Sequence, residues 1–254
     1  MADEFRSNGM SGTMELAREI DRTGREAGLP YVAVSADISD PSPMIGPDGK
    51  PLAETVFRWV NPEVVYWKDR AFALRSGLLG IVRVCAEPFY YQGGRMHSWR
   101  QIRVLDVANE TLDPEVYVAH RIAGAITCPV HSPMGAIGAV VWATGDASVD
   151  VADIFRRRAV DMQALALKFL SSYRDTSSVQ LPAAPVEFTR REIQCLKWAA
   201  AGKTDSEIAT IMNVSVPTIR FHLTNASRKL GVSGRSQTVR LATNLGYIGA
   251  ASAG

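Results

Sequence analysis

The most regular alternation of apolar and polar positions lies between residues 188 and 248. Over three successive stretches, apolar side chains recur at intervals of three and four residues, which is the spacing of a helix with one buried face. The side chains that share these faces are Ile193, Leu196 and Ala200 on the first stretch, Ile208 and Ile211 on the second, and Ile219, Leu223, Ala226 and Leu230 on the third. The pattern predicts three short helices around a common core.

Each of the three predicted helices has a recognisable start. Thr189 and Glu192 form a Thr-x-x-Glu capping box, in which the hydroxyl accepts from a backbone N–H of the first turn and the carboxylate reaches back to the cap. Thr204 and Glu207 repeat this box at the second helix, and Ser215 caps the third. These starts predict where the helices of the segment begin.

The exposed face of the third helix is typical of a helix that enters the major groove of DNA. Its members are Thr218, Arg220, Phe221, Thr224, Asn225 and Arg228. Within this set we expect Arg220 and Thr224 to contact base edges. The N-terminus of the second helix favours a phosphate, because its backbone N–H groups are free and the helix dipole is positive there. The side chains expected to hold phosphates are Lys203, Thr204, Ser215 and Arg228.

The charge of the chain is unevenly distributed. Residues 188 to 248 contain nine lysines and arginines against three acidic residues, a net charge of +6. The rest of the chain has 19 basic and 23 acidic residues, a net charge of −4. A basic helical module of this kind is typical of proteins that bind a polyanion. The alternative is a small helical bundle that is basic without binding DNA, in which the helix starts, the short turns and the charge coincide by chance.

Residues 1 to 174 mix helical and strand patterns. The predicted helices are 14–27, 62–77, 113–123 and 151–173, and the predicted strands are 31–36, 124–131 and 136–144, with a short edge strand at 87–91. The strands 124–131 and 136–144 are joined by a short turn and predict a hairpin. A strand-rich centre flanked by helices predicts an α+β domain, an α/β/α sandwich with room for a small-molecule pocket.

A segment rich in Ser, Pro and Ala separates the two parts. Residues 175–187 lack an amphipathic period, which favours a linker. The sequence therefore predicts a sensor and dimerisation domain at 1–174, this linker, and an all-α helix-turn-helix domain at 188–254.

The composition is that of an ordinary globular protein, with 46% hydrophobic and 21% charged residues. The longest apolar run, at 136–143, is too short to cross a bilayer, and the acidic, polar N-terminus does not resemble a signal peptide. Three widely spaced cysteines, Cys85, Cys128 and Cys195, fit a reducing compartment. We therefore expect a cytoplasmic protein that does not bind membranes.

The titratable side chains do not suggest a catalytic or metal site. The four histidines are scattered without the spacing of metal ligands. Cys128 and His131 are three apart on a predicted strand, so they point to opposite faces. The alternating β/α units of a phosphorylated receiver domain are missing as well. We expect no enzyme activity, no cofactor and no metal.

The helical segment resembles the DNA-binding domain of LuxR-type transcription regulators. The residues that carry the resemblance are Glu192, Leu196, Gly202, Lys203, Thr204, Glu207, Ile208, Ala209, Ser215, Thr218, His222, Asn225, Lys229 and Leu230. The resemblance covers about sixty residues. It implies a module of four helices that binds DNA as a dimer, with the fourth helix at about 236–244.

The N-terminal domain resembles the autoinducer-binding domain of the same family. Residues 122–138 look like that family's strand pair, and residues 72–74 and 88–91 match the flanks of its ligand site more loosely. The resemblance implies a site for a small-molecule signal, an acyl-homoserine lactone or a related ligand. The candidate ligand-binding residues are Tyr66, Trp67, Arg75, Tyr91, Thr127 and Val141.

Arg75 departs from the pattern of that family. In acyl-homoserine-lactone receptors the aligned residue is an aspartate that accepts from the ligand's amide N–H, whereas a guanidinium only donates. Three explanations are open. Arg75 is exposed on a locally shifted helix, or it pairs with an acidic side chain inside the protein, or it faces the pocket and binds an acceptor group of the ligand. Only the last implies a new chemical class of signal.

Together these patterns predict a quorum-sensing-type transcription factor. It would bind double-stranded promoter DNA as a homodimer under the control of a small-molecule signal, with RNA polymerase as a further candidate partner. Two alternatives remain, namely a ligand-independent regulator of the LuxR type and an antagonist that heterodimerises with another LuxR-type protein.

Overall fold

The computed structural model describes residues 2–40, 42–60, 77–176 and 186–249, with the side chains of residues 2–10 left out. The chain divides into two compact units, a larger N-terminal one that comprises residues up to 132 and 136–179, and a smaller C-terminal one that comprises residues 133–135 and the chain from residue 180 onward. Each unit is described by itself. No helix in the described part of the chain has both the length and the apolar character needed to cross a membrane.

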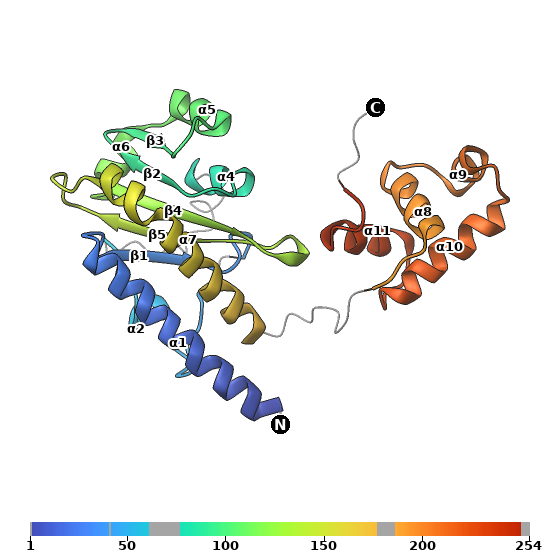
Figure 1. Cartoon of the computed structure of the whole chain (residues 1–254), viewed down its shortest axis with the longest axis horizontal. Helices are drawn as coiled ribbons and strands as arrows, with labels where there is room; N and C mark the ends of the chain where they lie inside the picture. The colour runs from blue at the N-terminus through green and yellow to red at the C-terminus, as the bar shows by residue number, and fades with distance from the viewer. Residues whose placement is uncertain (1, 41, 61–76, 177–185, 250–254) are drawn as a thin grey trace. The chain divides into compact units, whose positions relative to one another are not determined.

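An antiparallel sheet of five strands forms the centre of the N-terminal unit (Figure 1). The strands are β1 (Tyr31–Ser35), β2 (Phe89–Gln92), β3 (Arg95–His97), β4 (Gly124–His131) and β5 (Ile137–Thr144), and their order in the sheet is β1-β5-β4-β2-β3. The predicted hairpin is confirmed, because β4 and β5 pair over their whole length from Gly124 opposite Thr144 to His131 opposite Ile137.

Helices cover both faces of this sheet (Figure 1). The helices of the unit are α1 (Ala2–Glu26), α2 (Leu52–Thr55), α4 (Gly77–Val84), α5 (Arg103–Thr111), α6 (Pro114–Ala119) and α7 (Val151–Thr176). The long helices α1 and α7 pack side by side on one face, and α4 and α5 pack on the other. The predicted α+β class is confirmed, with the helical domain following in the chain.

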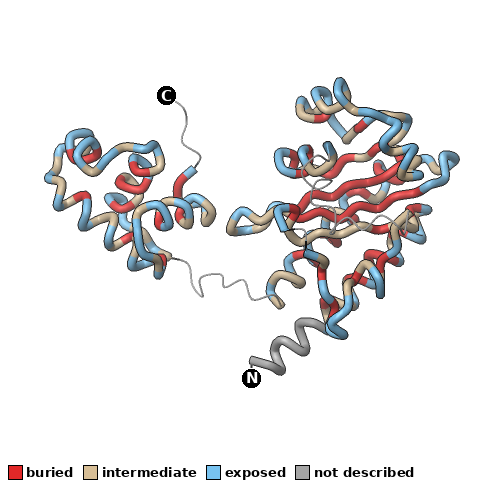
Figure 2. The backbone as a smooth tube through the Cα atoms, turned by 180° about the vertical axis from the view of Figure 1, so that it is seen from behind, coloured by how far each residue is buried: buried red, intermediate tan, exposed pale blue. Residues whose placement is uncertain are grey.

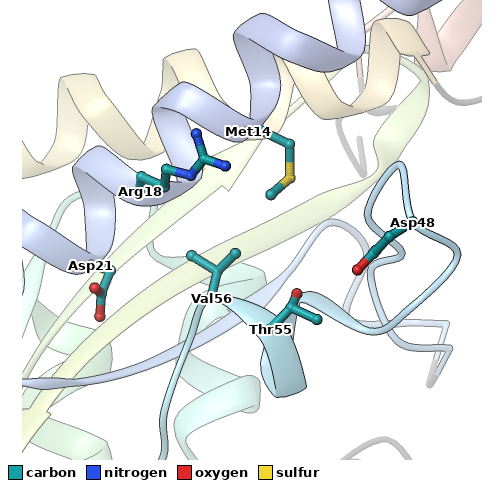
Figure 3. Close-up of a pocket in the computed structure, with 6 residues that line it drawn as sticks. All are labelled: Met14, Arg18, Asp21, Asp48, Thr55 and Val56. Carbon is teal, nitrogen blue, oxygen red and sulfur yellow. The ribbon is translucent and has the colours of Figure 1, made fainter.

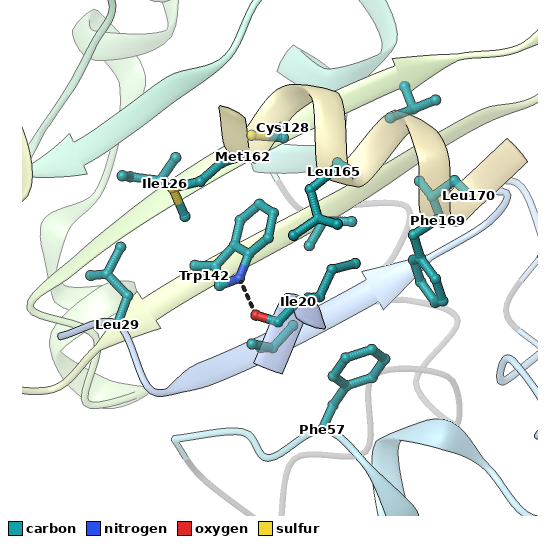
Figure 4. Packing of buried hydrophobic residues seen from close by; sticks show 14 of the residues in the cluster. Ile20, Leu29, Phe57, Ile126, Cys128, Trp142, Met162, Leu165, Phe169 and Leu170 are labelled. Carbon is teal, nitrogen blue, oxygen red and sulfur yellow. Dashed lines mark hydrogen bonds between the residues drawn. The ribbon is translucent and has the colours of Figure 1, made fainter. Parts of the chain in front are cut away.

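The alternation of side chains along β4 and β5 divides the core between the two faces. Ile126 and Cys128 of β4 and Trp142 of β5 are fully buried in the cluster that includes α1 and α7 (Figure 4). Their neighbours along the strands, Ala125 and Val141, belong to a separate cluster on the opposite face. Both faces of these strands are buried, which is why the strands read as continuous apolar runs.

Several boundaries differ from the sequence prediction. The first helix begins at Ala2 and not at residue 14, and the helix predicted over 113–123 ends at Ala119. The strand predicted at the sheet edge, β2, lies inside the sheet, because the unpredicted strand β3 pairs with its outer side. The two-residue turn between β2 and β3, Gly93-Gly94, has positive φ at both positions, so this glycine pair was the available signal for a hairpin.

Two other predicted segments lie wholly or largely outside the described residues. The helix predicted over 62–77 is one of them, apart from its last residue. The predicted linker at 175–187 is the other. Its first two residues belong to α7, and residues 177–185 are outside the described part.

Four helices form the C-terminal unit, namely α8 (Arg190–Ala200), α9 (Asp205–Met212), α10 (Val216–Lys229) and α11 (Arg235–Asn244). Leu196, Ile208, Ile219 and Ala226 are fully buried between them, as their spacing predicts. Ile211 does not join them. It is 45% exposed, because the short helix α9 packs against the core through the side that carries Ile208 and Ala209.

Candidate nucleic-acid interface and ligand face

Two capping boxes fix where α8 and α9 begin. At α8, Thr189 Oγ1 accepts from the backbone N–H of Glu192 at 3.2 Å, and Glu192 Oε2 accepts from the N–H of Thr189 at 2.7 Å. Thr204 and Glu207 repeat the arrangement at α9, with distances of 3.3 and 2.7 Å. Both predicted boxes are confirmed. They satisfy backbone donors that the helix itself leaves unpaired.

Helix α10 buries one side and presents the other to solvent. Its predicted cap is confirmed, because Ser215 Oγ accepts from the N–H of Thr218 at 3.4 Å. Six residues of the outer side were expected to face DNA. Four of them are exposed, namely Arg220, Phe221, Thr224 and Arg228, and two are half-buried, namely Thr218 and Asn225 (Figure 2 shows the burial along this helix). Phe221 is 61% exposed. A helix with this outer face is able to offer an apolar ring and two cations to a groove.

The residues expected to hold a phosphate at the start of α9 are already engaged with Glu207. The Thr204 hydroxyl donates to Glu207 Oε2 at 2.9 Å, and Lys203 Nζ lies 3.8 Å from Glu207 Oε1. These bonds hold the pKa of Glu207 below its usual value, the backbone and hydroxyl bonds of Thr204 most strongly. A phosphate would therefore compete with Glu207 for both side chains.

Sequence reasoning missed two residues at this surface, Asp205 and Arg235. Asp205 is the first residue of α9, and its carboxylate is contacted by Arg235 of α11 and by Arg220 of α10. Arg235 also donates to the backbone carbonyl of Lys203. The contact between Asp205 and Arg235 spans thirty positions in the chain, and no short motif could have revealed it.

A second ion pair lies inside the domain. Glu192 is 3% exposed, and its Oε2 is 2.8 Å from Lys229 Nζ, which also donates to the Glu187 carbonyl at 2.9 Å. Burial acts to raise the pKa of Glu192, but the bonds from Lys229 and Thr189 outweigh it and hold the pKa below its ordinary value. The pair ties the end of α10 to the start of α8.

Three of the predicted ligand-binding residues lie on one face of the N-terminal sheet. Tyr91, Thr127 and Val141 are buried, with exposures of 5%, 2% and 9%, and Thr127 is directly opposite Val141 in the pairing of β4 and β5. Tyr66, Trp67 and Arg75 lie outside the described residues. The three explanations of Arg75 therefore remain as they stood.

Tyr117 joins this face and was not predicted. Its ring stacks on that of Tyr91, with centroids 3.9 Å apart and planes inclined by 18°. Burial raises the pKa of the Tyr117 hydroxyl far above its usual value, and the neighbouring Tyr91 adds to the effect. Burial likewise raises the pKa of Tyr91. Both phenols are therefore neutral donors at physiological pH, suited to a neutral acceptor such as a carbonyl oxygen.

A small cavity of about 320 Å³ lies elsewhere in the unit, between α1 and the segment around α2 (Figure 3). Its lining consists of Met14, Arg18, Asp21, Asp48, Thr55 and Val56. Charged side chains of both signs, Arg18, Asp21 and Asp48, make up half of this lining, and it contains none of the predicted ligand-binding residues. In the described part of the chain, no group of histidine, cysteine and acidic side chains could hold a metal ion.

The comparison with known families is decisive at the C-terminal unit. Residues 186–242 match the family described as bacterial regulatory proteins, luxR family, which includes the segment that forms α8, α9 and α10. Over these residues the chain is similar to the LuxR family. The resemblance stated for the helical segment is thereby confirmed.

Two curated proteins that are similar to about half of the chain are named as transcription regulators. The transcriptional activator protein VanR of Vibrio anguillarum is 35% identical over 130 residues, which are 50% of this chain and 52% of VanR. The quorum sensing-dependent transcriptional regulator VjbR of Brucella ovis is 32% identical over 126 residues, 48% of this chain and 47% of VjbR. The chain thus spans about half the length of these curated relatives.

A solved structure shares the fold over most of the chain. SdiA of Escherichia coli superimposes with a TM-score of 0.51 at 20% identity, covering 92% of this chain and 91% of SdiA. At this identity the similarity concerns the fold alone, namely an α+β unit followed by a helix-turn-helix unit.

Proposed function

We propose that this chain is a LuxR-type transcription regulator that binds promoter DNA as a dimer and responds to a small-molecule signal. The observation that carries the proposal is the outer face of α10. This face presents Arg220, Phe221, Thr224 and Arg228 to solvent on a helix whose other side is locked into the core by Ile219 and Ala226.

The polar side chains of α10 suit the two kinds of contact that a DNA reader needs. We assign Arg220 and Thr224 to base edges and Arg228 to the phosphate backbone. We also assign Lys203 and Thr204 at the start of α9 and Ser215 at the start of α10 to phosphates, which the positive end of a helix dipole attracts. A phosphate at α9 would compete with Glu207 for Lys203 and Thr204. The excess of basic residues between 188 and 248 adds attraction that does not depend on the DNA sequence.

A dimer would place two α10 helices in successive major grooves on one side of the duplex. The half-sites would then be centred about 34 Å apart and related as an inverted repeat. We propose a homodimer in a cytoplasmic protein, with RNA polymerase as a further partner.

The buried face around Tyr91, Thr127 and Val141 is the proposed site for the signal. The neutral phenols of Tyr91 and Tyr117 are suited to acceptor groups, and the alanines and valine around them to an acyl chain. An acyl-homoserine lactone or a related ligand fits this chemistry. VjbR, which is similar to 48% of the chain, is named as quorum sensing-dependent.

Selection from a library of random duplexes with the purified full-length chain tests DNA binding. We expect an enriched inverted repeat with half-sites one helical turn apart, and loss of specific binding in Arg220→Ala with an unchanged circular dichroism spectrum. Absence of any enriched motif would overturn the proposal. If the chain also formed a heterodimer with another LuxR-type protein and released it from its operator, the antagonist would be the better explanation.

Expression with and without a mixture of acyl-homoserine lactones, followed by native mass spectrometry, tests the signal. We expect a protein species heavier by the mass of one lactone for each chain. Val141→Trp should prevent this binding by filling the buried face, whereas Val160→Trp, at an exposed position on α7, should not. A ligand-free protein that binds DNA equally well in both preparations would instead identify a ligand-independent regulator.

A further inference from the structure

We propose that Arg220 recognises a guanine in the major groove and that Asp205 and Arg235 are positioning residues that orient its guanidinium. This inference rests on the proposed DNA binding and specifies what one side chain reads. The inference is based on the contact of three side chains, Asp205 of α9, Arg220 of α10 and Arg235 of α11.

The carboxylate of Asp205 divides its two oxygens between two arginines. Oδ1 accepts from Arg235 Nη1, and Oδ2 lies 3.4 Å from Arg220 Nε. Arg235 Nη2 donates to the backbone carbonyl of Lys203, so the Arg235 guanidinium is held from two directions. Asp205 is in turn fixed at the first position of α9, next to the capping threonine, Thr204. The carboxylate is therefore a stationary acceptor for Arg220.

The contact through Nε determines which edge of the Arg220 guanidinium remains available. With Nε directed to Asp205, the two terminal nitrogens, Nη1 and Nη2, make no hydrogen bond within the described residues. The Arg220 side chain is 70% exposed on the outer side of α10, which leaves it accessible to a partner in solution. A pair of parallel N–H donors matches the O6 and N7 acceptors that guanine presents in the major groove.

Arg228 on the same helix offers a natural contrast. Its Nη1 donates to Asn225 Oδ1 at 3.1 Å, so one of the two terminal donors is already used. No carboxylate contacts it within the described residues. A guanidinium with one terminal nitrogen already engaged suits a single phosphate oxygen better than the paired acceptors of a base. The two arginines should therefore behave differently when removed.

The negative charge of Asp205 has a second consequence. The Asp205 side chain is half-buried, at 26% exposure, and a carboxylate at a DNA-facing surface is repelled by phosphates, so this side chain opposes binding to any sequence. If Asp205 orients Arg220, its replacement should weaken recognition of the correct base while strengthening binding to unrelated DNA. If Asp205 had a merely structural role, its replacement would lower the affinity for the correct sequence and for unrelated DNA together.

The test uses the full-length chain and the duplex motif that it enriches from a random library. Each guanine of the motif is replaced in turn by 7-deazaguanine, which lacks the N7 acceptor but pairs normally. We expect one guanine in each half-site whose replacement weakens wild-type binding about 10-fold or more. The same replacement should have little effect on Arg220→Ala, because the side chain that reads N7 is gone.

Asp205→Ala and Asp205→Asn test the positioning role. In both variants the ratio of affinities for the guanine motif and for a scrambled duplex should fall several-fold, while the affinity for the scrambled duplex rises. Arg235→Met should lower the ratio as well. Arg228→Ala is the matched control and should weaken both duplexes by the same factor. Thermal melting of each variant separates unfolding from a change in recognition, and Asp205→Asn preserves the shape of the side chain if Asp205→Ala unfolds the domain.

The outcomes distinguish this inference from the function on which it rests. If a motif is enriched but no 7-deazaguanine lowers wild-type binding, or if Arg220→Ala retains the same sensitivity, the guanine assignment is wrong and DNA binding stands. If the two Asp205 variants lose affinity equally for both duplexes, the positioning role is wrong. If no motif is enriched, both proposals are overturned.

Discussion

The indole Nε1 of Trp142 on β5 donates a hydrogen bond to the backbone carbonyl of Ile20 on α1, at 3.0 Å (Figure 4). Both residues are fully buried, and they are 122 positions apart in the chain. The bond allows the largest side chain of the core to be buried without leaving its single donor unpaired. It also fixes how closely α1 approaches the sheet.

This close approach explains why α1 contains a glycine at position 24. A Cβ added to Gly24 would lie 2.6 Å from both Trp142 Cδ1 and the backbone oxygen of Leu29. We expect Gly24→Ala to lower the free energy of unfolding by about 1–3 kcal/mol, since overpacking outweighs the gain in helix propensity. Urea denaturation measures the change.

Gly12 in the same helix is the control, because nothing lies within 4 Å of an added Cβ there. Gly12→Ala should raise the free energy of unfolding by about 0.5–1 kcal/mol. Stabilisation by both substitutions would contradict the packing described for Trp142.

Removing the cation beside Glu192 should produce a pH-dependent loss of stability. The pKa of Glu192 is lowered in the folded state, so its contribution is present above the unfolded pKa and is lost as pH falls through the folded value. In Lys229→Met the carboxylate stays buried without its partner, and we expect a loss of about 1–3 kcal/mol at pH 7. The loss should shrink as the pH approaches the folded pKa.

Denaturation of the full chain between pH 4 and pH 8 measures this trend. Lys197→Met removes an exposed lysine of α8 and should change stability by less than about 0.5 kcal/mol at every pH. An equal loss for Lys229→Met at acid and neutral pH would argue against an ionised Glu192.

A phosphate contact by Arg228 has a signature in the salt dependence of DNA binding. Arg228→Ala should weaken all duplexes alike and reduce the slope of log affinity against log salt by about one. Arg156→Ala serves as the control, because this exposed arginine of the N-terminal unit pairs with Asp153. Its slope should equal that of the wild type. An unchanged slope in Arg228→Ala would remove Arg228 from the phosphate contacts.

The helices of the C-terminal unit were predictable because their signals are local. The boxes at Thr189 and Thr204 and the cap at Ser215 each act over three residues, so the sequence states them directly. Ile211 was assigned to the core wrongly, because a helix of two turns has too few positions for its period to define which side is buried. The signal for β3 was present in Gly93-Gly94, because a glycine pair suits the two-residue turn of a hairpin.

By itself, the sequence determined the class of each unit, the starts of the capped helices, the β4–β5 hairpin and the family that the C-terminal unit resembles. These features depend on neighbours in the chain and on hydrophobic period, which are both visible in one dimension. Only the tertiary structure decided that β2 lies inside the sheet, that Trp142 bonds to α1, and that Asp205 stands between Arg220 and Arg235. Each of these features depends on contacts between elements that are distant in the chain. A charged side chain or a short strand has no periodic pattern in the sequence that could indicate its partner.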